Sequence, residues 1–188
     1  MGELINIHAI LPYSRVNGPG LREVVFFQGC ARDCEGCFNP DTHTFEARKL
    51  HTPWEVLEKR AGGVEGITVS GGEPFMQKDG LLLLLKQAKG LGLSTVVYTG
   101  FTLKELKSDR LAASILEYID VLIDGPYIEE RKEKTLLARG SENQRLIFLT
   151  DRYNESDFLM PGKVEVIIGR DGAVTETGFS RVIFGAGH

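Results

Sequence analysis

The stretch FFQGCARDCEGCFNP, residues 26–40, decides the fold of this chain. It contains all three cysteines of the protein, Cys30, Cys34 and Cys37. The preceding residues 23–28 are rich in Val and Phe and predict a β-strand that delivers Cys30 at its carboxyl end. An odd number of clustered thiols, with short loops between them, indicates a metal or redox site in a reducing compartment and not a disulfide framework.

The composition is that of an ordinary globular domain. The chain has 188 residues, of which 42% are hydrophobic and 26% charged, which fits one domain with a sizeable core. The formal charge of −4 argues against a general nucleic-acid-binding protein. The N-terminus lacks the pattern of a signal peptide, and the longest apolar run, residues 81–85, is far shorter than a membrane span of ~18 residues. We therefore expect a cytoplasmic protein with no membrane and no nucleic-acid partner.

Strand and helix patterns alternate along the chain, and glycine or polar residues follow each strand. This is the pattern of βα units around a parallel sheet. A complete (β/α)₈ barrel takes ~250 residues, so this chain can build only part of one, or an open sheet. The predicted elements are strands at residues 4–10, 23–28, 66–70, 94–98, 121–124 and 146–149, and helices at 52–61, 79–91, 103–106 and 111–118.

The C-terminal part of the chain has a different pattern. The stretch KVEVIIGRDGAVTETGF, residues 163–179, predicts a β-hairpin that turns at Asp171 and Gly172. No repeat or low-complexity linker marks a boundary before it. We expect one domain at residues 1–150, with its metal-binding loop at 30–37, and a C-terminal extension at residues 151–188 packed on the same domain.

Three thiols leave two metal chemistries open. Thiolates select soft metals, so zinc and an iron–sulfur cluster compete. His43 would complete a Cys₃His zinc site, but zinc ligands usually come as two short-spaced pairs and here form one CxxxCxxC run. A [4Fe–4S] cluster ordinarily takes four cysteines, so here one iron would stay open to another ligand. An open metal position is what a reactive site requires, and the pattern favours the cluster.

A second motif, SGGEP at residues 70–74, ends a predicted strand on the same side as the cysteine loop. Gly71 and Gly72 would let a ligand approach the backbone closely, and Glu73 offers an acceptor for an ammonium group. Alone, the motif is equally well a tight turn. Paired with the cysteine run, it is much more specific.

Together these motifs resemble a known family. They are NGPGLR, FFQGCARDCEGCFNP, VSGGEP, YTGFTLKEL, VLIDGPYIEE and RGSENQR, in this order over roughly residues 5–148. The chain resembles radical S-adenosylmethionine (SAM) enzymes and, among these, the anaerobic ribonucleoside-triphosphate reductase activating proteins, which are glycyl-radical enzyme activases. The last two motifs point to this branch. The fold then expected is α/β: a partial (β/α)6-type TIM barrel, open on one side, with a C-terminal β-hairpin extension.

The resemblance also implies the cofactors and their contacts. Cys30, Cys34 and Cys37 would ligate three irons of a single [4Fe–4S] cluster, and the amine and carboxylate of SAM would chelate the fourth. The GGEP residues would receive the methionine amine, and an arginine of RGSENQR would hold the carboxylate or face the partner. The SAM contacts expected are Gly36, Phe38, Gly71, Gly72, Glu73, Tyr98, Thr99 and Arg139.

The reaction implied is reductive cleavage of SAM. The reduced cluster passes one electron to the sulfonium, which gives methionine and a 5′-deoxyadenosyl radical, and this radical removes a hydrogen from one backbone glycine of a partner enzyme. The cofactors carry the chemistry while the protein positions and shields them. The partners implied are a glycyl-radical enzyme, above all anaerobic ribonucleotide reductase, and a flavodoxin-type electron donor.

Three alternatives stay open. The chain could activate another glycyl-radical enzyme, of the pyruvate formate-lyase type. It could be a radical SAM enzyme for a small molecule, although that activity calls for a more closed site. From a different class, it could be a zinc-stabilised binding module that uses the three cysteines and His43, which leaves GGEP without a role.

Overall fold

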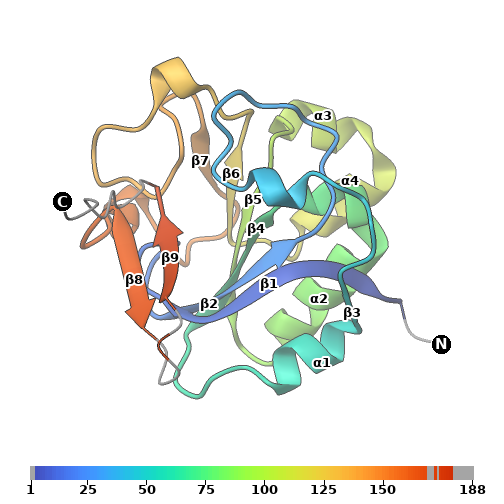
Figure 1. The fold of residues 1–188 in the computed structure, drawn as a ribbon. Coiled ribbons are helices and arrows are strands. Elements are labelled where there is room, and N and C mark those ends of the chain that lie inside the picture. The colour runs from blue at the N-terminus through green and yellow to red at the C-terminus, as the bar shows by residue number, and fades with distance from the viewer. Residues whose placement is uncertain (1–2, 169–171, 173, 180–188) are drawn as a thin grey trace.

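A mixed seven-stranded sheet forms the centre of the computed structural model, which describes residues 3–168, 172 and 174–179 (Figure 1). The strand order is β3-β1-β2-β4-β5-β6-β7. Neighbouring strands are parallel from β2 through β6, and β1, β3 and β7 pair antiparallel at the two sides. The strands are β1 (Ile5–Ser14), β2 (Arg22–Phe27), β3 (Lys49–His51), β4 (Gly66–Gly71), β5 (Ser94–Tyr98), β6 (Val121–Asp124) and β7 (Arg145–Phe148).

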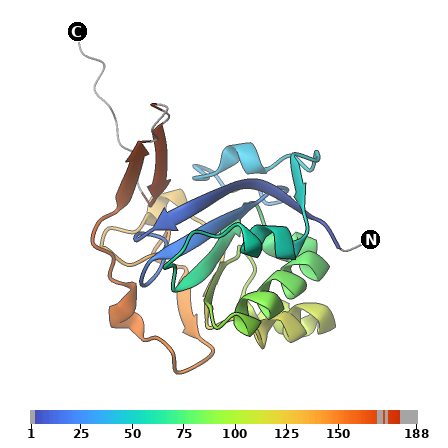
Figure 2. The same cartoon turned by 90° about the horizontal axis from the view of Figure 1, so that it is seen from below.

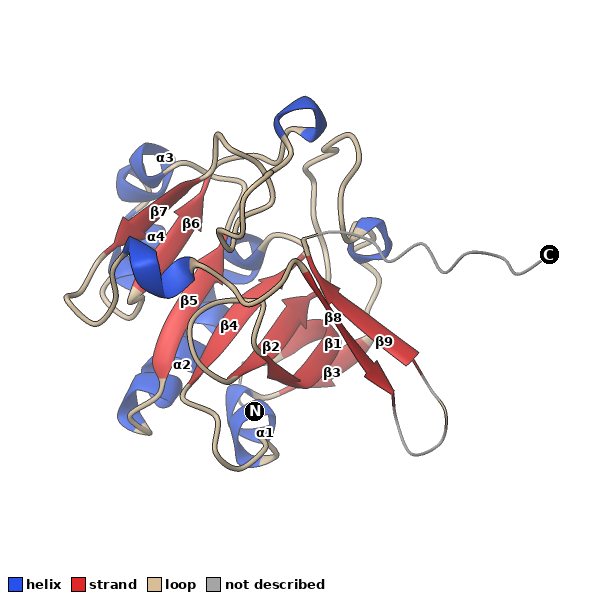
Figure 3. Cartoon of the chain, turned by 90° about the vertical axis from the view of Figure 1, so that its left-hand side faces the viewer, coloured by secondary structure: helices blue, strands red, loops and turns tan. Residues whose placement is uncertain are grey.

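The α-helices lie on one side of this sheet, and a separate two-stranded hairpin lies on the other (Figure 2). Figure 3 shows the hairpin apart from the main sheet. The helices are α1 (Pro53–Glu58), α2 (Lys78–Gly90), α3 (Leu103–Ser108) and α4 (Arg110–Leu116), and the hairpin strands are β8 (Val164–Ile168) and β9 (Val174–Gly178). Short 3₁₀ turns occupy Pro40–Thr42, Pro74–Gln77, Glu129–Arg131 and Glu155–Phe158.

Alternation along the strands divides the apolar residues between two clusters. Val97 of β5 packs in the larger cluster with the buried leucines of α2, whereas Val96 and Tyr98 face the other side of the sheet. There they meet Phe158 and Met160, which come from the chain after β7. The segment after residue 150 therefore packs on the second face of the sheet and contributes to its core.

Most predicted elements are confirmed, and local chemistry explains their ends. Helix α1 begins as the sequence indicates: Thr52 and Glu55 form a reciprocal capping box, and Pro53 takes the first helical position. The mixed charge of residues 129–134 suggests a solvent-exposed helix, but only a single 3₁₀ turn, Glu129–Arg131, forms there. The hairpin is present, although Asp171 of its predicted turn lies outside the described residues.

The α/β class and the large open sheet are confirmed, but a (β/α)6 arrangement is not. Parallel pairing joins only β2, β4, β5 and β6. Because β1 runs antiparallel to β2, and β7 antiparallel to β6, the outer strands extend the sheet without adding βα repeats. Within the described residues, no helix has both the length and the apolar character needed to span a bilayer.

Candidate functional site

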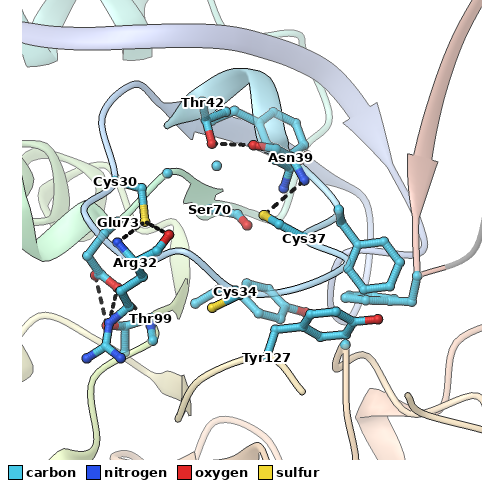
Figure 4. A pocket seen from close by; sticks show the side chains of 18 of the residues that line it. Cys30, Arg32, Cys34, Cys37, Asn39, Thr42, Ser70, Glu73, Thr99 and Tyr127 are labelled. Carbon is cyan, nitrogen blue, oxygen red and sulfur yellow. Dashed lines mark hydrogen bonds and ion pairs between the residues drawn. The ribbon is translucent and has the colours of Figure 1, made fainter. Parts of the chain in front are cut away.

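The carboxyl ends of the parallel strands share one edge of the sheet, and the predicted site lies there. The cysteine loop follows β2, GGEP follows β4, and Thr99 follows β5. Loops at this edge are where open α/β sheets bind ligands. Here they surround a cavity of about 420 Å³ that all three cysteines line (Figure 4). This volume lies in the range of small-molecule sites.

Backbone hydrogen bonds fasten the two principal loops to each other. The Gly72 amide donates to Phe27 O at 2.8 Å, and the Glu73 amide donates to Gly29 O at 2.9 Å. On the other side of the cysteine loop, the Gly29 amide donates to Thr42 O at 2.7 Å. The loop that carries the cysteines is therefore held at its base against GGEP before any ligand binds.

The two glycines of GGEP are required because the backbone of residues 27–29 passes very close to them. Gly71 has φ +99°, and a Cβ there would lie 2.5 Å from the Phe27 nitrogen. A Cβ on Gly72 would lie 2.3 Å from the Gly29 carbonyl oxygen. Neither distance is tolerable against backbone atoms, so contact with the end of β2 and with Gly29, just before Cys30, is sufficient to explain both glycines.

Glu73 joins the ends of β4 and β5. It is 1% exposed; one carboxylate oxygen accepts hydrogen bonds from the Phe75 amide and the Thr99 hydroxyl, and the other from the Gly100 amide, all at 2.8–3.0 Å. Burial raises the pKa of Glu73, while these donors and nearby Arg32 oppose the increase. The carboxylate is thus already engaged by the protein itself.

The cysteines surround a common space from one loop (Figure 4). The Arg32 amide donates to Cys30 Sγ, and the Asn39 amide to Cys37 Sγ, both at 3.4 Å. Burial raises the pKa of the Cys30 thiol, and the Arg32 amide acts in the opposite direction. Amides directed at sulfur stabilise thiolates and tune iron–sulfur clusters. In the described part of the chain, no three His, Cys, Asp or Glu side chains are grouped closely enough to bind one metal ion together. A [4Fe–4S] cluster does not require this, because each thiolate binds a different iron.

Most of the other residues predicted to contact SAM line this cavity. Phe38, Tyr98 and Thr99 line it together with Gly71, Gly72 and Glu73. Gly36 instead borders a neighbouring cavity beside Cys34 and Cys37. Its φ of +67° and the proximity of Glu129, 2.3 Å from a Cβ built there, give Gly36 a conformational and packing role in the loop.

The two arginines of the RGSENQR motif form ion pairs with carboxylates of the same chain. The Arg139 guanidinium pairs with Glu133 and donates to Gln144 O at 2.9 Å; it is not among the residues lining the cavity. Arg145 pairs with Asp124 across β6 and β7. These arginines support the loops of RGSENQR.

Sequence reasoning missed other residues of the cavity, above all Arg32. Its guanidinium stacks 4.3 Å from the Phe101 ring centroid and approaches Glu73 at 4.0 Å. Among the described residues, its buried Nε has no hydrogen-bond partner. Its position between Cys30 and Cys34 in the sequence is the signal from which Arg32 could have been predicted as a site residue. The other missed residues that matter below are Asn17, Thr177 and Phe179.

Comparisons with known proteins identify the family of this chain. A family model described as a 4Fe-4S single cluster domain matches residues 16–147. A protein named anaerobic ribonucleoside-triphosphate reductase-activating protein from Pasteurella multocida is 37% identical over 147 residues, which cover 71% of this chain and 90% of that protein. The chain belongs to this family of activating proteins. Family members of the same name from Escherichia coli K12 and Enterobacteria phage T4 are 32% and 34% identical and cover 74% and 78% of this chain.

The family relationship does not extend over the whole chain. The alignments cover 96% of the Escherichia coli and phage proteins, so these family members are shorter than this chain. The family model ends before the hairpin. A solved structure, QueE from Escherichia coli, is similar over 53% of this chain and 54% of its own, with a TM-score of 0.45 and 15% identity, too distant to carry an argument.

Proposed function

We propose that this protein is a radical SAM activase that cleaves SAM reductively at one [4Fe–4S] cluster and generates a glycyl radical on anaerobic ribonucleoside-triphosphate reductase. Family members carry the name of that reductase's activating protein. The observation that carries the proposal is that all three cysteines of the sequence and the GGEP loop line one cavity. Three thiolates leave a fourth iron open, as SAM binding requires.

The donor set fits the cluster. Cys30, Cys34 and Cys37 would hold it, because they line one cavity and because backbone amides are directed at two of the sulfurs. When bound and reduced, the cluster supplies the electron for cleavage of SAM, and a flavodoxin-type protein is the donor we expect. The protein contributes loops that are held in place beforehand and a partly enclosed cavity.

The methionine end of SAM would lie beside Glu73 and Arg32. Because three internal donors engage the Glu73 carboxylate, its main task is to fix the loops, and the GGEP backbone would meet the amine. Arg32, from the cysteine loop, replaces Arg139 as our candidate for the SAM carboxylate, since Arg32 lines the cavity. Phe38, Tyr98 and Thr99 would contact the adenosyl portion, and Gly36 and Arg139 would act as supports.

We also propose how the chain is organised around this reaction. Residues 1–150 would form the catalytic domain, which acts as a partial barrel whose open side admits the glycine loop of the partner. Residues 151–188 would extend that domain, as the packing of Phe158 and Met160 in its core supports. We expect the protein to work in the cytoplasm, where thiols stay reduced.

A second candidate function would use His43, which lines the cavity together with the three cysteines. In that case the chain would be a zinc-stabilised binding module. The side-chain positions do not favour it, since no three His, Cys, Asp or Glu side chains of the described residues are grouped closely enough to bind one ion. Such a module would retain about one zinc per chain after purification and would show no response to SAM.

The test is anaerobic activation of a purified reductase. The reconstituted protein, dithionite or reduced flavodoxin, and SAM are mixed with anaerobic ribonucleoside-triphosphate reductase, and EPR is recorded. We expect a glycyl radical signal that is lost when the acceptor glycine of the reductase is replaced by alanine. A signal only with a pyruvate formate-lyase-type enzyme would reassign the partner. No signal with any glycyl-radical enzyme, despite SAM cleavage, would favour a small-molecule substrate.

A further inference from the structure

The C-terminal hairpin lies outside the family model, yet it reaches the cavity that the cysteines line. Residues Glu176, Thr177, Gly178 and Phe179 belong to the cavity wall together with Cys30 and Glu73. Figure 3 shows β8 and β9 as a separate unit beside the main sheet. The wall of the candidate site is therefore built partly from a segment that the family model does not contain.

Specific contacts anchor the hairpin to the main domain. Asn17, in the turn before β2, donates one hydrogen bond to Thr177 Oγ1 at 2.9 Å and one to Ser14 Oγ at 2.8 Å. The Arg15 amide donates to the Glu165 carboxylate at 3.1 Å. Asn17 is 6% exposed and Thr177 is 8% exposed, so their hydrogen bond is protected from water.

The end of β9 directs Phe179 toward the site. Gly178 has φ +122°, and a Cβ there would lie 2.2 Å from Lys163 O, so only glycine allows this approach. The Phe179 amide then donates to the same Lys163 carbonyl at 2.7 Å. This geometry fixes Phe179, the last described residue of the hairpin, against the residue that precedes β8.

Phe179 completes a group of aromatic rings at the cavity. Its ring centroid lies 5.9 Å from that of Tyr98 and 6.5 Å from that of Phe38, the latter pair edge to face. Phe38 in turn lies 4.9 Å from Tyr127. All four rings line the cavity, and Phe38 directly follows Cys37. Aromatic faces bind planar heterocycles by offset stacking and exclude water from the space beside them.

We propose that Phe179 of the C-terminal hairpin is a cofactor-site residue: it closes the aromatic side of the cavity, shields the cysteine thiols from solvent and contacts the adenine ring of bound SAM. The adenine contact rests on the proposed function; the shielding of the thiols does not. The hairpin thus supplies from within this chain a part of the cover that we otherwise expect from the partner.

The experiment compares full-length wild-type protein with Phe179→Ala, Phe179→Leu and Val174→Ala. Val174 lies on the same hairpin, is 56% exposed and does not line the cavity, which makes it the matched control. Cluster-free protein is treated anaerobically with iodoacetamide, and the alkylation rate at each cysteine is read by peptide mass spectrometry. SAM affinity of the reconstituted protein is measured by equilibrium dialysis, and thermal unfolding verifies folding.

We expect Phe179→Ala to speed thiol alkylation several-fold and to weaken SAM binding roughly 3- to 10-fold, the value of one aromatic contact. Phe179→Leu should keep alkylation near the wild-type rate but weaken SAM binding, and Val174→Ala should change neither. Equal alkylation rates in wild type and Phe179→Ala would overturn the proposal. Faster alkylation in Phe179→Ala, with SAM bound by no form of the protein, would support the shielding role and count against the proposed function.

Discussion

Two loops at the same edge of the sheet, the cysteine loop after β2 and the GGEP loop after β4, are built in opposite ways. In the GGEP loop, Glu73 and Pro74 are buried, and the Glu73 carboxylate accepts hydrogen bonds from three donors of the protein. The cysteine loop is partly exposed, and its three sulfur-bearing side chains line a cavity. We call the GGEP loop the frame, because its hydrogen bonds fix the ends of β4 and β5 relative to each other. The cysteine loop instead presents its three sulfur-bearing side chains to the cavity.

This difference teaches that a motif associated with binding can have a structural task as well. A ligand can approach Gly71 and Gly72, but backbone contacts with Phe27 and Gly29 already require both glycines. Substitutions in the frame should therefore change stability first, and substitutions in the cysteine loop should change cofactor binding first.

The largest effect is expected from Cys34→Ser. Cys34 is only partly buried, so its replacement should leave the unfolding free energy of the cluster-free protein within about 0.5 kcal/mol of wild type. Iron bound after anaerobic reconstitution should fall from about four per chain to a small fraction of that. Iron and sulfide analysis checks this, with Ala31→Ser, in the same loop, as the control. Full iron binding by Cys34→Ser would contradict the assignment.

Gly72→Ala tests the frame. Its Cβ would lie 2.3 Å from the Gly29 carbonyl oxygen, and backbone cannot yield easily, so we expect a loss of about 3 kcal/mol in unfolding free energy. Urea unfolding monitored by circular dichroism measures it. The matched control is Gly62→Ala, where nothing lies within 4 Å and the change should stay within about 0.5 kcal/mol. Equal losses of unfolding free energy in Gly72→Ala and Gly62→Ala would contradict a structural role for the GGEP loop.

Glu23 lies within β2, the strand that leads into the cysteine loop, and gives a pH-dependent test of how that strand is packed. It is 2% exposed, one of its oxygens has no hydrogen-bond partner in the described structure, and burial raises its pKa to about 7 although Arg60 opposes this. A carboxyl whose pKa is higher folded than unfolded adds stability at low pH and loses it as pH rises through the folded value.

Wild type should therefore lose about 1–2 kcal/mol of unfolding free energy between pH 5 and pH 8 through Glu23. Glu23→Gln should remove this component and leave cluster binding unchanged. Urea titrations at several pH values measure both forms. Parallel pH profiles for wild type and variant would show that Glu23 does not titrate in this range.

Arg32→Gln tests the binding role of the cysteine loop, and its effect, on the affinity for SAM, should be the smallest of the predicted effects. Without the guanidinium, SAM should bind roughly 10-fold more weakly, as expected for one lost hydrogen bond to a carboxylate. Equilibrium dialysis measures the affinity. Arg139→Gln is the control, because Arg139 pairs with Glu133 and does not line the cavity. A larger loss in Arg139→Gln would return the carboxylate contact to Arg139.

The sequence predicted those parts of the fold that depend on local patterns. The strand before Cys30, the strand at residues 94–98 and the helix that begins after Thr52 depend on neighbours along the chain, and all three are confirmed. The antiparallel direction of β7 was not readable, because its pairing with β6 depends on contacts distant in sequence, such as Asp124 with Arg145.

The same limit applies to the site. The cysteines and GGEP were recognisable as motifs, and the structure brings them to one cavity. Arg139 was expected there on the strength of its charge, but Glu133, six residues earlier, engages that charge. Phe179 could not be assigned, since only the fold carries it from the end of the chain to Tyr98 and Phe38.

The most direct test of the central claim is EPR of the reduced, anaerobically reconstituted protein with and without SAM. If three cysteines hold a cluster with an open iron, a [4Fe–4S]⁺ signal should appear, and its shape should change when SAM is added. A colourless protein that retains about one zinc per chain and does not respond to SAM would contradict the account.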